Sequence, residues 1–137
     1  RDMPLLGICA GMQVMSGILG AKLTSNIHKY LPQALPHFNF TSDHDIEIVK
    51  DSLLSKIVKK DIININSDHN EAVVEVPENI LISARSTDGC VEAIEIKGKK
   101  FALGVEWHPE LCCFKEAQIS DSNPDYLIFK AFIEACI

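Results

Sequence analysis

The sequence predicts an α/β domain built on an open sheet that is mostly parallel and also contains antiparallel strands. Three observations predict this class. Near the N-terminus, an apolar run typical of a strand buried on both faces leads directly into a helical pattern (residues 4–19). A strand-rich segment follows, and a strand and an amphipathic helix come last. With 137 residues, the chain can form one domain with a hydrophobic core.

The first two expected elements are a strand over Pro4–Ile8 and a helix over Ala10–Leu19. The helix has apolar residues at spacings of three, six and seven, which we expect to share its buried face: Met12, Met15, Ile18 and Leu19. Gly20 follows as a C-cap.

The middle of the chain begins with a polar stretch, residues 21–43, in which we expect a loop and one short strand at Ala21–Thr24. Alternating apolar and β-branched residues then predict strands. These strands are Asp45–Val49, Asp61–Asn66, Ile80–Ser86 and Val91–Ile96. Between the first two, Ser52–Val58 resembles a short helix with Asp51 or Ser52 as its N-cap.

The last elements are joined by strong turn signals. Asp88-Gly89 predicts a hairpin between two neighbouring strands. Lys97–Lys100 turns into a buried strand, Phe101–Trp107, and Asn123-Pro124 starts a closing helix over Asp125–Cys136. We expect the apolar side of that helix to hold Leu127, Phe129, Ala131, Phe132 and Ile133.

Composition restricts the compartment and the partners. The net charge of −6 disfavours nucleic acid, and no apolar run approaches the ~20 residues that span a bilayer. The five cysteines include no Cys-x-x-Cys pair, which favours a reducing compartment, so we expect a cytoplasmic protein. The adjacent Cys112 and Cys113 lack a further His or Cys at ligand spacing, so we expect no metal and no cofactor.

A cysteine occupies the point where the first strand must turn into the first helix. In Gly7-Ile8-Cys9-Ala10-Gly11, small residues two before and two after Cys9 allow a tight elbow. The cysteine would lie at a helix N-terminus, which favours the thiolate and lowers the thiol pKa. The Ala10 N–H would point to where an acyl oxyanion develops. The alternative is a buried structural cysteine in a glycine-rich turn.

A base for such a nucleophile is suggested where the strand Phe101–Trp107 ends. Pro109 forces His108 into extended geometry, so His108 and Glu110 should share a face. A carboxylate beside the imidazole can fix its tautomer and stabilise its charged form. The alternative is a strand-end histidine near a solvated glutamate. We expect His28, His37 and His44, in the polar loop region that ends at His44, to be solvated.

Two stretches together resemble the class I glutamine amidotransferase-like superfamily of the Cys-His-Glu type: "PLLGICAGMQ" (residues 4–13) and "GVEWHPE" (residues 104–110). Two more, "NSDHNEAV" (66–73) and "STDGCVEAIE" (86–95), resemble its gamma-glutamyl-gamma-aminobutyrate hydrolase-like branch. The resemblance runs in order over nearly the whole chain. It implies a flavodoxin-like open sheet, of which residues 1–137 would be the C-terminal portion of a single domain truncated at its N-terminus.

The resemblance also implies roles for individual residues. Cys9 would be the nucleophile, His108 the base and Glu110 the orienting acid. The remaining implied positions comprise the elbow glycines Gly7 and Gly11, the oxyanion donor Ala10, and the substrate-side residues Gln13, Ser67 and His69. For Ser67 and His69, strand-end capping and loop packing is an equally weighted alternative.

The implied activity is cleavage of the gamma-glutamyl amide of glutamine or of a gamma-glutamyl amine through a thioester. A glutaminase unit that supplies ammonia to a synthetase and an inactive truncated remnant are the alternatives. Ala10 departs from the arginine usual after the nucleophile in the hydrolase branch, which leaves the substrate open. The expected partner is a small gamma-glutamyl substrate, without nucleic acid or membrane, and a homo-oligomer is compatible with the sequence.

Overall fold

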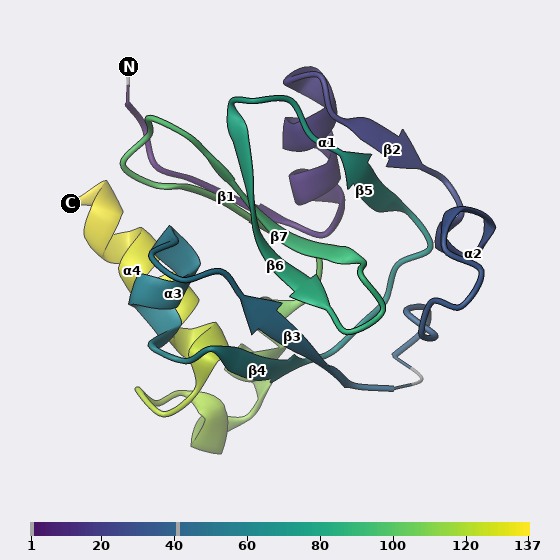
Figure 1. Cartoon of the computed structure of the whole chain (residues 1–137). Coiled ribbons are helices and arrows are strands. Elements are labelled where there is room, and N and C mark those ends of the chain that lie inside the picture. The colour runs from purple at the N-terminus through teal and green to yellow at the C-terminus, as the bar shows by residue number, and fades with distance from the viewer. Residues whose placement is uncertain (1, 41) are drawn as a thin grey trace.

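The computed structural model describes residues 2–40 and 42–137, which form a layered α/β fold (Figure 1). One sheet has six strands in the order β1-β8-β7-β6-β3-β4, and β2 and β5 form a separate two-stranded sheet. The strands are β1 (Leu5–Ile8), β2 (Lys22–Thr24), β3 (His44–Ile48), β4 (Ile62–Ile65), β5 (Ala72–Glu75), β6 (Ile80–Ser86), β7 (Val91–Ile96) and β8 (Ala102–Val105). The helices are α1 (Ala10–Ile18), α2 (Ile27–Tyr30), α3 (Leu53–Val58) and α4 (Pro124–Cys136), with 3-10 turns η1 (Pro109–Phe114) and η2 (Glu116–Gln118).

The predicted α/β class is confirmed, but the proportion of parallel pairing is lower than expected. Among the described strands, β1 pairs in parallel with β8, whereas the pairs β8-β7, β7-β6, β6-β3 and β3-β4 are all antiparallel. For the β6-β7 and β7-β8 pairs, the reason is the short connection between the strands. Short links such as Thr87–Cys90 between β6 and β7 make a hairpin, and a parallel crossover needs about a dozen residues or more.

The two faces of the six-stranded sheet are covered by different elements (Figure 1). On one face, α3 and α4 contribute Leu54, Val58 and Ile128 to the main core around the buried Trp107. On the other, Met12 and Met15 of α1 pack with apolar residues of β5, β6 and β7. Both faces of the central strands therefore contribute to a hydrophobic core.

The expected buried face of α1 is confirmed at Met12 and Met15, but it is wrong at Ile18, which is 80% exposed. Six residues rotate about 240° around a helix, so Ile18 lies well away from the face of Met12. In α4, the most buried side chain is Ile128, which the predicted apolar set omitted, and Ile133 of that set is exposed.

Most expected elements lie within two residues of their observed bounds. Ser52 is the N-cap of α3 and accepts a hydrogen bond from the Ser55 N–H at 3.0 Å. Gly20, with φ of 100°, follows the α1 cap at Leu19. The helix α2 and the strand β5 were not expected. Residues 72–75 form β5 because they pair with β2, which lies about 50 positions earlier in the chain.

The topology brings several chain segments to one end of the six-stranded sheet. The parallel strands β1 and β8 both end there, at Ile8 and Val105. Because the other pairs are antiparallel, β6 and β4 also end there, while β7 and β3 begin there. Titratable side chains that are far apart in the sequence therefore meet at this end.

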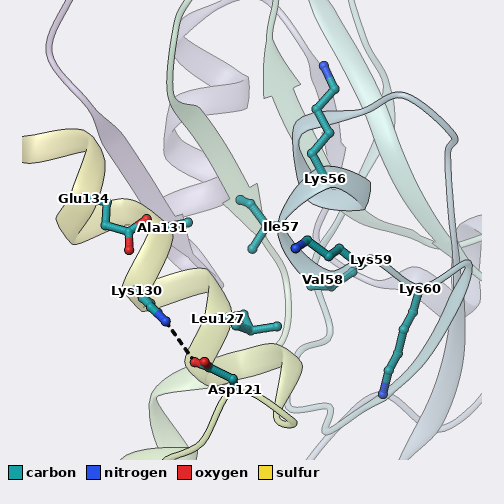
Figure 2. A pocket seen from close by; sticks show the side chains of 10 residues that line it. All are labelled: Lys56, Ile57, Val58, Lys59, Lys60, Asp121, Leu127, Lys130, Ala131 and Glu134. Carbon is teal, nitrogen blue, oxygen red and sulfur yellow. Dashed lines mark hydrogen bonds and ion pairs between the residues drawn. The ribbon is translucent and has the colours of Figure 1, made fainter.

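The opposite flank of the fold holds a hollow of about 600 Å³ between α3 and α4 (Figure 2). Lysines 56, 59, 60 and 130 border it, and Lys130 pairs with Asp121 at 3.0 Å. None of the sequence-predicted site residues lines this hollow. Within the described residues, no helix has both the length and the apolar character needed to cross a membrane.

Candidate active site

Cys9 occupies a strained backbone position between β1 and α1. Its φ of 49° and ψ of −107° lie in a region that L-residues rarely adopt. The Cys9 N–H donates to the Val105 carbonyl at 2.8 Å, which extends the β1-β8 pairing by one residue before the chain turns. The elbow therefore holds a half-buried thiol at the end of the sheet, where α1 begins.

The elbow leaves no room for a side chain at Gly7 but does leave room at Gly11. A Cβ at Gly7 would lie 2.9 Å from backbone atoms of Gly11 and Met12, so a side chain there would push α1 off the strand. At Gly11, a Cβ would meet no described atom within 4 Å. The sequence placed one glycine on each side of the cysteine, and the structure explains the need for the first.

The expected lowering of the Cys9 thiol pKa is wrong for this structure. Burial and the nearby Glu106 carboxyl raise that pKa to about 11, against a smaller opposing effect of the Ala10 N–H hydrogen bond. Burial removes the water that would solvate a thiolate, and the helix N-terminus does not compensate for it. At neutral pH the thiol is protonated, so a nucleophilic Cys9 requires a base.

His108 and Glu110 form a hydrogen-bonded pair beyond the end of β8. His108 Nδ1 lies 2.7 Å from Glu110 Oε1, with the side chains 23% and 41% exposed. The expected geometry was wrong in one respect. The chain does not stay extended, because Pro109 starts the 3-10 turn η1 and Glu110 lies in its first turn. Within this turn the carboxylate still lies beside the imidazole.

Asn66 fixes the backbone of His108 from the neighbouring loop. Its Oδ1 accepts from the His108 N–H and its Nδ2 donates to the His108 carbonyl, both at 2.9 Å. The ring of Phe40 lies against the imidazole, with centroids 5.6 Å apart. Neither residue was identified from the sequence as part of the site, although Asn66 begins the "NSDHNEAV" stretch.

Gln13, one turn into α1, donates from Nε2 to Glu106 Oε1 at 2.7 Å. Glu106 is fully buried, and its burial raises the carboxyl pKa to about 8. Glu106 lies two residues before His108, so strand periodicity was the signal that could have identified it. The Gln13 side chain thus points into the protein at the start of the site.

Ser67 and His69 also point inward, into a buried polar cluster. Ser67 Oγ lies 3.2 Å from His37 Nδ1, and His69 Nδ1 donates to the Glu71 carbonyl at 2.7 Å. His69 Nδ1 also lies 3.5 Å from Glu106 Oε1. The loop that follows β4 therefore connects the surroundings of Cys9 to this cluster.

The expectation that the histidines of the polar stretch are solvated is confirmed for His28 but wrong for His37 and His44, which are buried. Both surround Glu92 of β7, a fully buried carboxylate, as His69 does. The distances to Glu92 Oε1 are 3.3 Å from His37 Nδ1, 3.6 Å from His44 Nε2 and 3.7 Å from His69 Nε2. No local pattern indicated the burial of His37, because its cause is a partner on a distant strand, whereas His44 lies on the buried face of β3 with Ile46.

Carboxylates and histidines in this cluster stabilise each other's charged forms. Although burial opposes it, Glu92 and Asp88 raise the pKa of His37, and Glu92 and Glu106 raise the pKa of His69. Despite its own burial, the Glu92 carboxyl has a lowered pKa because of these two histidines.

Comparison with known proteins identifies the family. The model of the family "Peptidase C26" matches residues 1–110. The chain is 31% identical over 141 residues to "Putative glutamine amidotransferase Rv2859c" of Mycobacterium tuberculosis, covering 98% of this chain and 41% of that protein. It is 28% identical over 145 residues to gamma-glutamyl-gamma-aminobutyrate hydrolase PuuD of Escherichia coli, covering 99% of this chain and 55% of PuuD. The chain thus spans about half the length of these relatives.

A solved structure has the same fold. The chain matches a Thermoplasma acidophilum protein, named as a "putative gmp synthase subunit a protein", with a TM-score of 0.73 at 19% identity. The match covers 99% of this chain and 58% of the other. The family model includes both the Cys9 elbow and the His108-Pro109-Glu110 segment. The chain therefore belongs to the Peptidase C26 family of glutamine amidotransferase-like proteins.

Proposed function

We propose that the protein hydrolyses the gamma-glutamyl amide of a small substrate through a thioester on Cys9, with His108 as the base and Glu110 as its orienting acid. The observation that carries this proposal is that the parallel strands β1 and β8 end side by side. The strained Cys9 elbow follows one strand, and the hydrogen-bonded His108–Glu110 pair follows the parallel strand beside it. Catalytic groups gather at such strand ends in open α/β sheets.

The first half of the reaction begins with proton transfer. Glu110 accepts a hydrogen bond from His108 Nδ1–H, which fixes the tautomer and leaves the Nε2 lone pair able to take the proton of the Cys9 thiol. The sulfur attacks the γ-carbonyl carbon, and the carbonyl oxygen becomes an oxyanion near the Ala10 N–H. When the intermediate collapses, the C–N bond breaks and His108 returns the proton to the leaving amine.

The second half regenerates the thiol. Water gives a proton to His108 and attacks the thioester carbon, and the C–S bond breaks as the sulfur is reprotonated. One gamma-glutamyl amide and one water thus yield one carboxylic acid and one amine. The raised pKa of Cys9 makes the base necessary in this scheme, because little thiolate is present before substrate binds.

A gamma-glutamyl electrophile such as 6-diazo-5-oxo-L-norleucine tests the nucleophile. Peptide mapping after limited labelling should find the adduct on Cys9, and labelling should disappear in Cys9→Ser. Cys113→Ser is the matched control, because Cys113 is exposed but lies outside the elbow. Preferential labelling of Cys113 or Cys136 would contradict the assignment and favour an inactive remnant.

Competition between glutamine and a set of gamma-glutamyl amines tests the substrate class. We expect kcat/KM at least tenfold higher for one gamma-glutamyl amine, which corresponds to ~1.4 kcal/mol of transition-state preference. The gamma-glutamyl-gamma-aminobutyrate hydrolases among the relatives support this direction. A preference for glutamine, or activity that requires an added synthetase, would favour the ammonia-supplying alternative.

A further inference from the structure

We propose that His37, His69, Cys90 and Glu92 form a closed, structural site for a divalent cation of the zinc type, behind the catalytic residues. The four side chains are all buried, and one ligand atom from each lies within 4.8 Å of the others. They come from three separate segments that meet at one end of the sheet: the loop after α2, the loop after β4, and the start of β7.

The separations suit a tetrahedral ion. Bonds of ~2.0–2.3 Å from zinc to nitrogen, oxygen and sulfur place neighbouring ligand atoms ~3.3–3.8 Å apart. Glu92 Oε1 lies 3.3 Å from His37 Nδ1 and 3.7 Å from His69 Nε2. The four ligand atoms lie up to 4.8 Å apart, so the wider pairs would close by about 1 Å when an ion binds.

Each histidine is oriented by a hydrogen bond from its other ring nitrogen. His37 Nε2 lies 2.6 Å from Asp88 Oδ2, and His69 Nδ1 lies 2.7 Å from the Glu71 carbonyl oxygen. Both oxygens can only accept, so these two nitrogens carry the protons. His37 Nδ1 and His69 Nε2 face Glu92, which favours a proton on each, and a cation bound there would displace those protons. His37 Nδ1 also lies 3.2 Å from Ser67 Oγ. Histidines that bind metals are held in this way by carboxylates and carbonyls.

Several inner atoms of the cluster make no hydrogen bond to a described residue, whereas Cys90 Sγ lies 3.7 Å from the Val91 carbonyl oxygen. Within residues 2–40 and 42–137, His69 Nε2 and both carboxylate oxygens of Glu92 have no hydrogen-bond partner, and both side chains are more than nine-tenths buried. Buried polar atoms are normally satisfied, and an unpaired buried carboxylate is costly. A dication bound by one thiolate, one carboxylate and two neutral imidazoles makes a set of zero net charge, which removes that cost.

The donor set selects the class of cation. Nitrogen and sulfur ligands suit zinc and similar first-row ions, whereas magnesium and calcium prefer oxygen. Four protein ligands leave no open position, so the ion would have a structural role. It would hold the loop 66–71, which carries Asn66 and the Asp68 carbonyl that lies 3.8 Å from Cys9 Sγ.

Cobalt(II) binding tests the site in the whole protein after treatment with a chelator. We expect one equivalent of Co²⁺ to give tetrahedral d–d absorption and a thiolate-to-metal charge-transfer band. The band should disappear in Cys90→Ser. It should persist in the double variant Cys112→Ser/Cys113→Ser, which removes the two adjacent thiols that lie 4.0 Å apart. Absence of stoichiometric Co²⁺ binding by the wild type, or a band that depends on Cys112 and Cys113 instead, would overturn the proposal.

A second measurement on the wild type covers the case in which Cys90→Ser fails to fold. The ¹¹³Cd NMR shift of the cadmium-loaded protein should indicate one sulfur ligand, and Zn²⁺ but not Mg²⁺ should raise the Tm. A shift that indicates no sulfur or two sulfurs, or a Tm that does not respond to Zn²⁺, would contradict the site. None of these readouts involves gamma-glutamyl hydrolysis, so this proposal and the proposed function can fail separately.

Discussion

The Cys9–His108–Glu110 rim and the buried His37–His69–Cys90–Glu92 cluster lie at the same end of the sheet but differ in solvation. The rim pair of His108 and Glu110 is partly exposed and joined by a direct 2.7 Å hydrogen bond. In the cluster, Glu92 is fully buried, and its ion-pair contacts among the described residues are 3.3 Å or longer. Water can compensate a charge at the rim, whereas the interior must supply a counter-charge.

Because of this difference in solvation, we expect the two groups to respond to mutation in opposite ways. A substitution at the rim should change the chemistry and leave the fold nearly intact. A substitution in the cluster should change stability first, because it leaves a buried charge unpaired. Four experiments test this contrast.

The largest expected effect is the loss of activity in Cys9→Ala, by at least ~10⁴-fold in kcat, because no thioester can form. Cys9→Gly should be equally inactive but more stable than Cys9→Ala by ~1 kcal/mol, since glycine relieves the positive φ of 49°. Urea unfolding and steady-state kinetics measure both effects. Equal stability of the two variants would show that the backbone at position 9 is not strained.

Alkylation of Cys9 by iodoacetamide should accelerate about tenfold per pH unit from pH 7 to 10, since the thiolate fraction rises in proportion below a pKa of about 11. The measurement uses a Cys113→Ser/Cys136→Ser background, in which the exposed thiols are removed. A rate that levels off by pH 8 would instead indicate a thiolate stabilised by the elbow, which is the expectation from the sequence.

Glu110→Gln and Glu92→Gln form a matched pair. Glu110→Gln should lower kcat/KM by ~10²-fold, because glutamine can hydrogen-bond the imidazole but cannot stabilise its charge, and should change stability by less than ~0.5 kcal/mol. Glu92→Gln should cost ~3 kcal/mol of unfolding free energy, because the buried histidines lose their counter-charge. Steady-state kinetics measures the loss of kcat/KM, and denaturant unfolding measures the loss of stability. An equal stability loss in both variants would contradict the contrast in solvation.

The smallest expected effect is in Asn66→Ala, which removes both hydrogen bonds that Asn66 makes to the His108 backbone. We expect a ~10-fold loss in kcat and ~1–2 kcal/mol of lost stability. Asn66→Asp is the control, since it keeps the acceptor for the His108 N–H but places an oxygen against the His108 carbonyl. An unchanged kcat in both variants would show that Asn66 has no positioning role.

Local sequence was sufficient for much of the fold. The bounds of β6 and β7, the Ser52 cap of α3 and the elbow at Gly7 all depend on interactions between residues near each other in the chain. The hydrogen bond between His108 and Glu110 is local as well, because a two-residue separation holds the groups together in either an extended chain or a 3-10 turn. Short-range patterns therefore predicted these features even where the assumed conformation was wrong.

Tertiary structure alone decided which polar groups lost contact with water. His37 and Glu92 are 55 positions apart, yet both are completely buried and 3.3 Å apart. The raised thiol pKa of Cys9 has the same origin, since burial and Glu106, which lies 97 positions away in the sequence, outweigh the adjacent Ala10 N–H. Desolvation and Coulomb energies sum over every neighbour in space, so a pattern read along the chain cannot supply them.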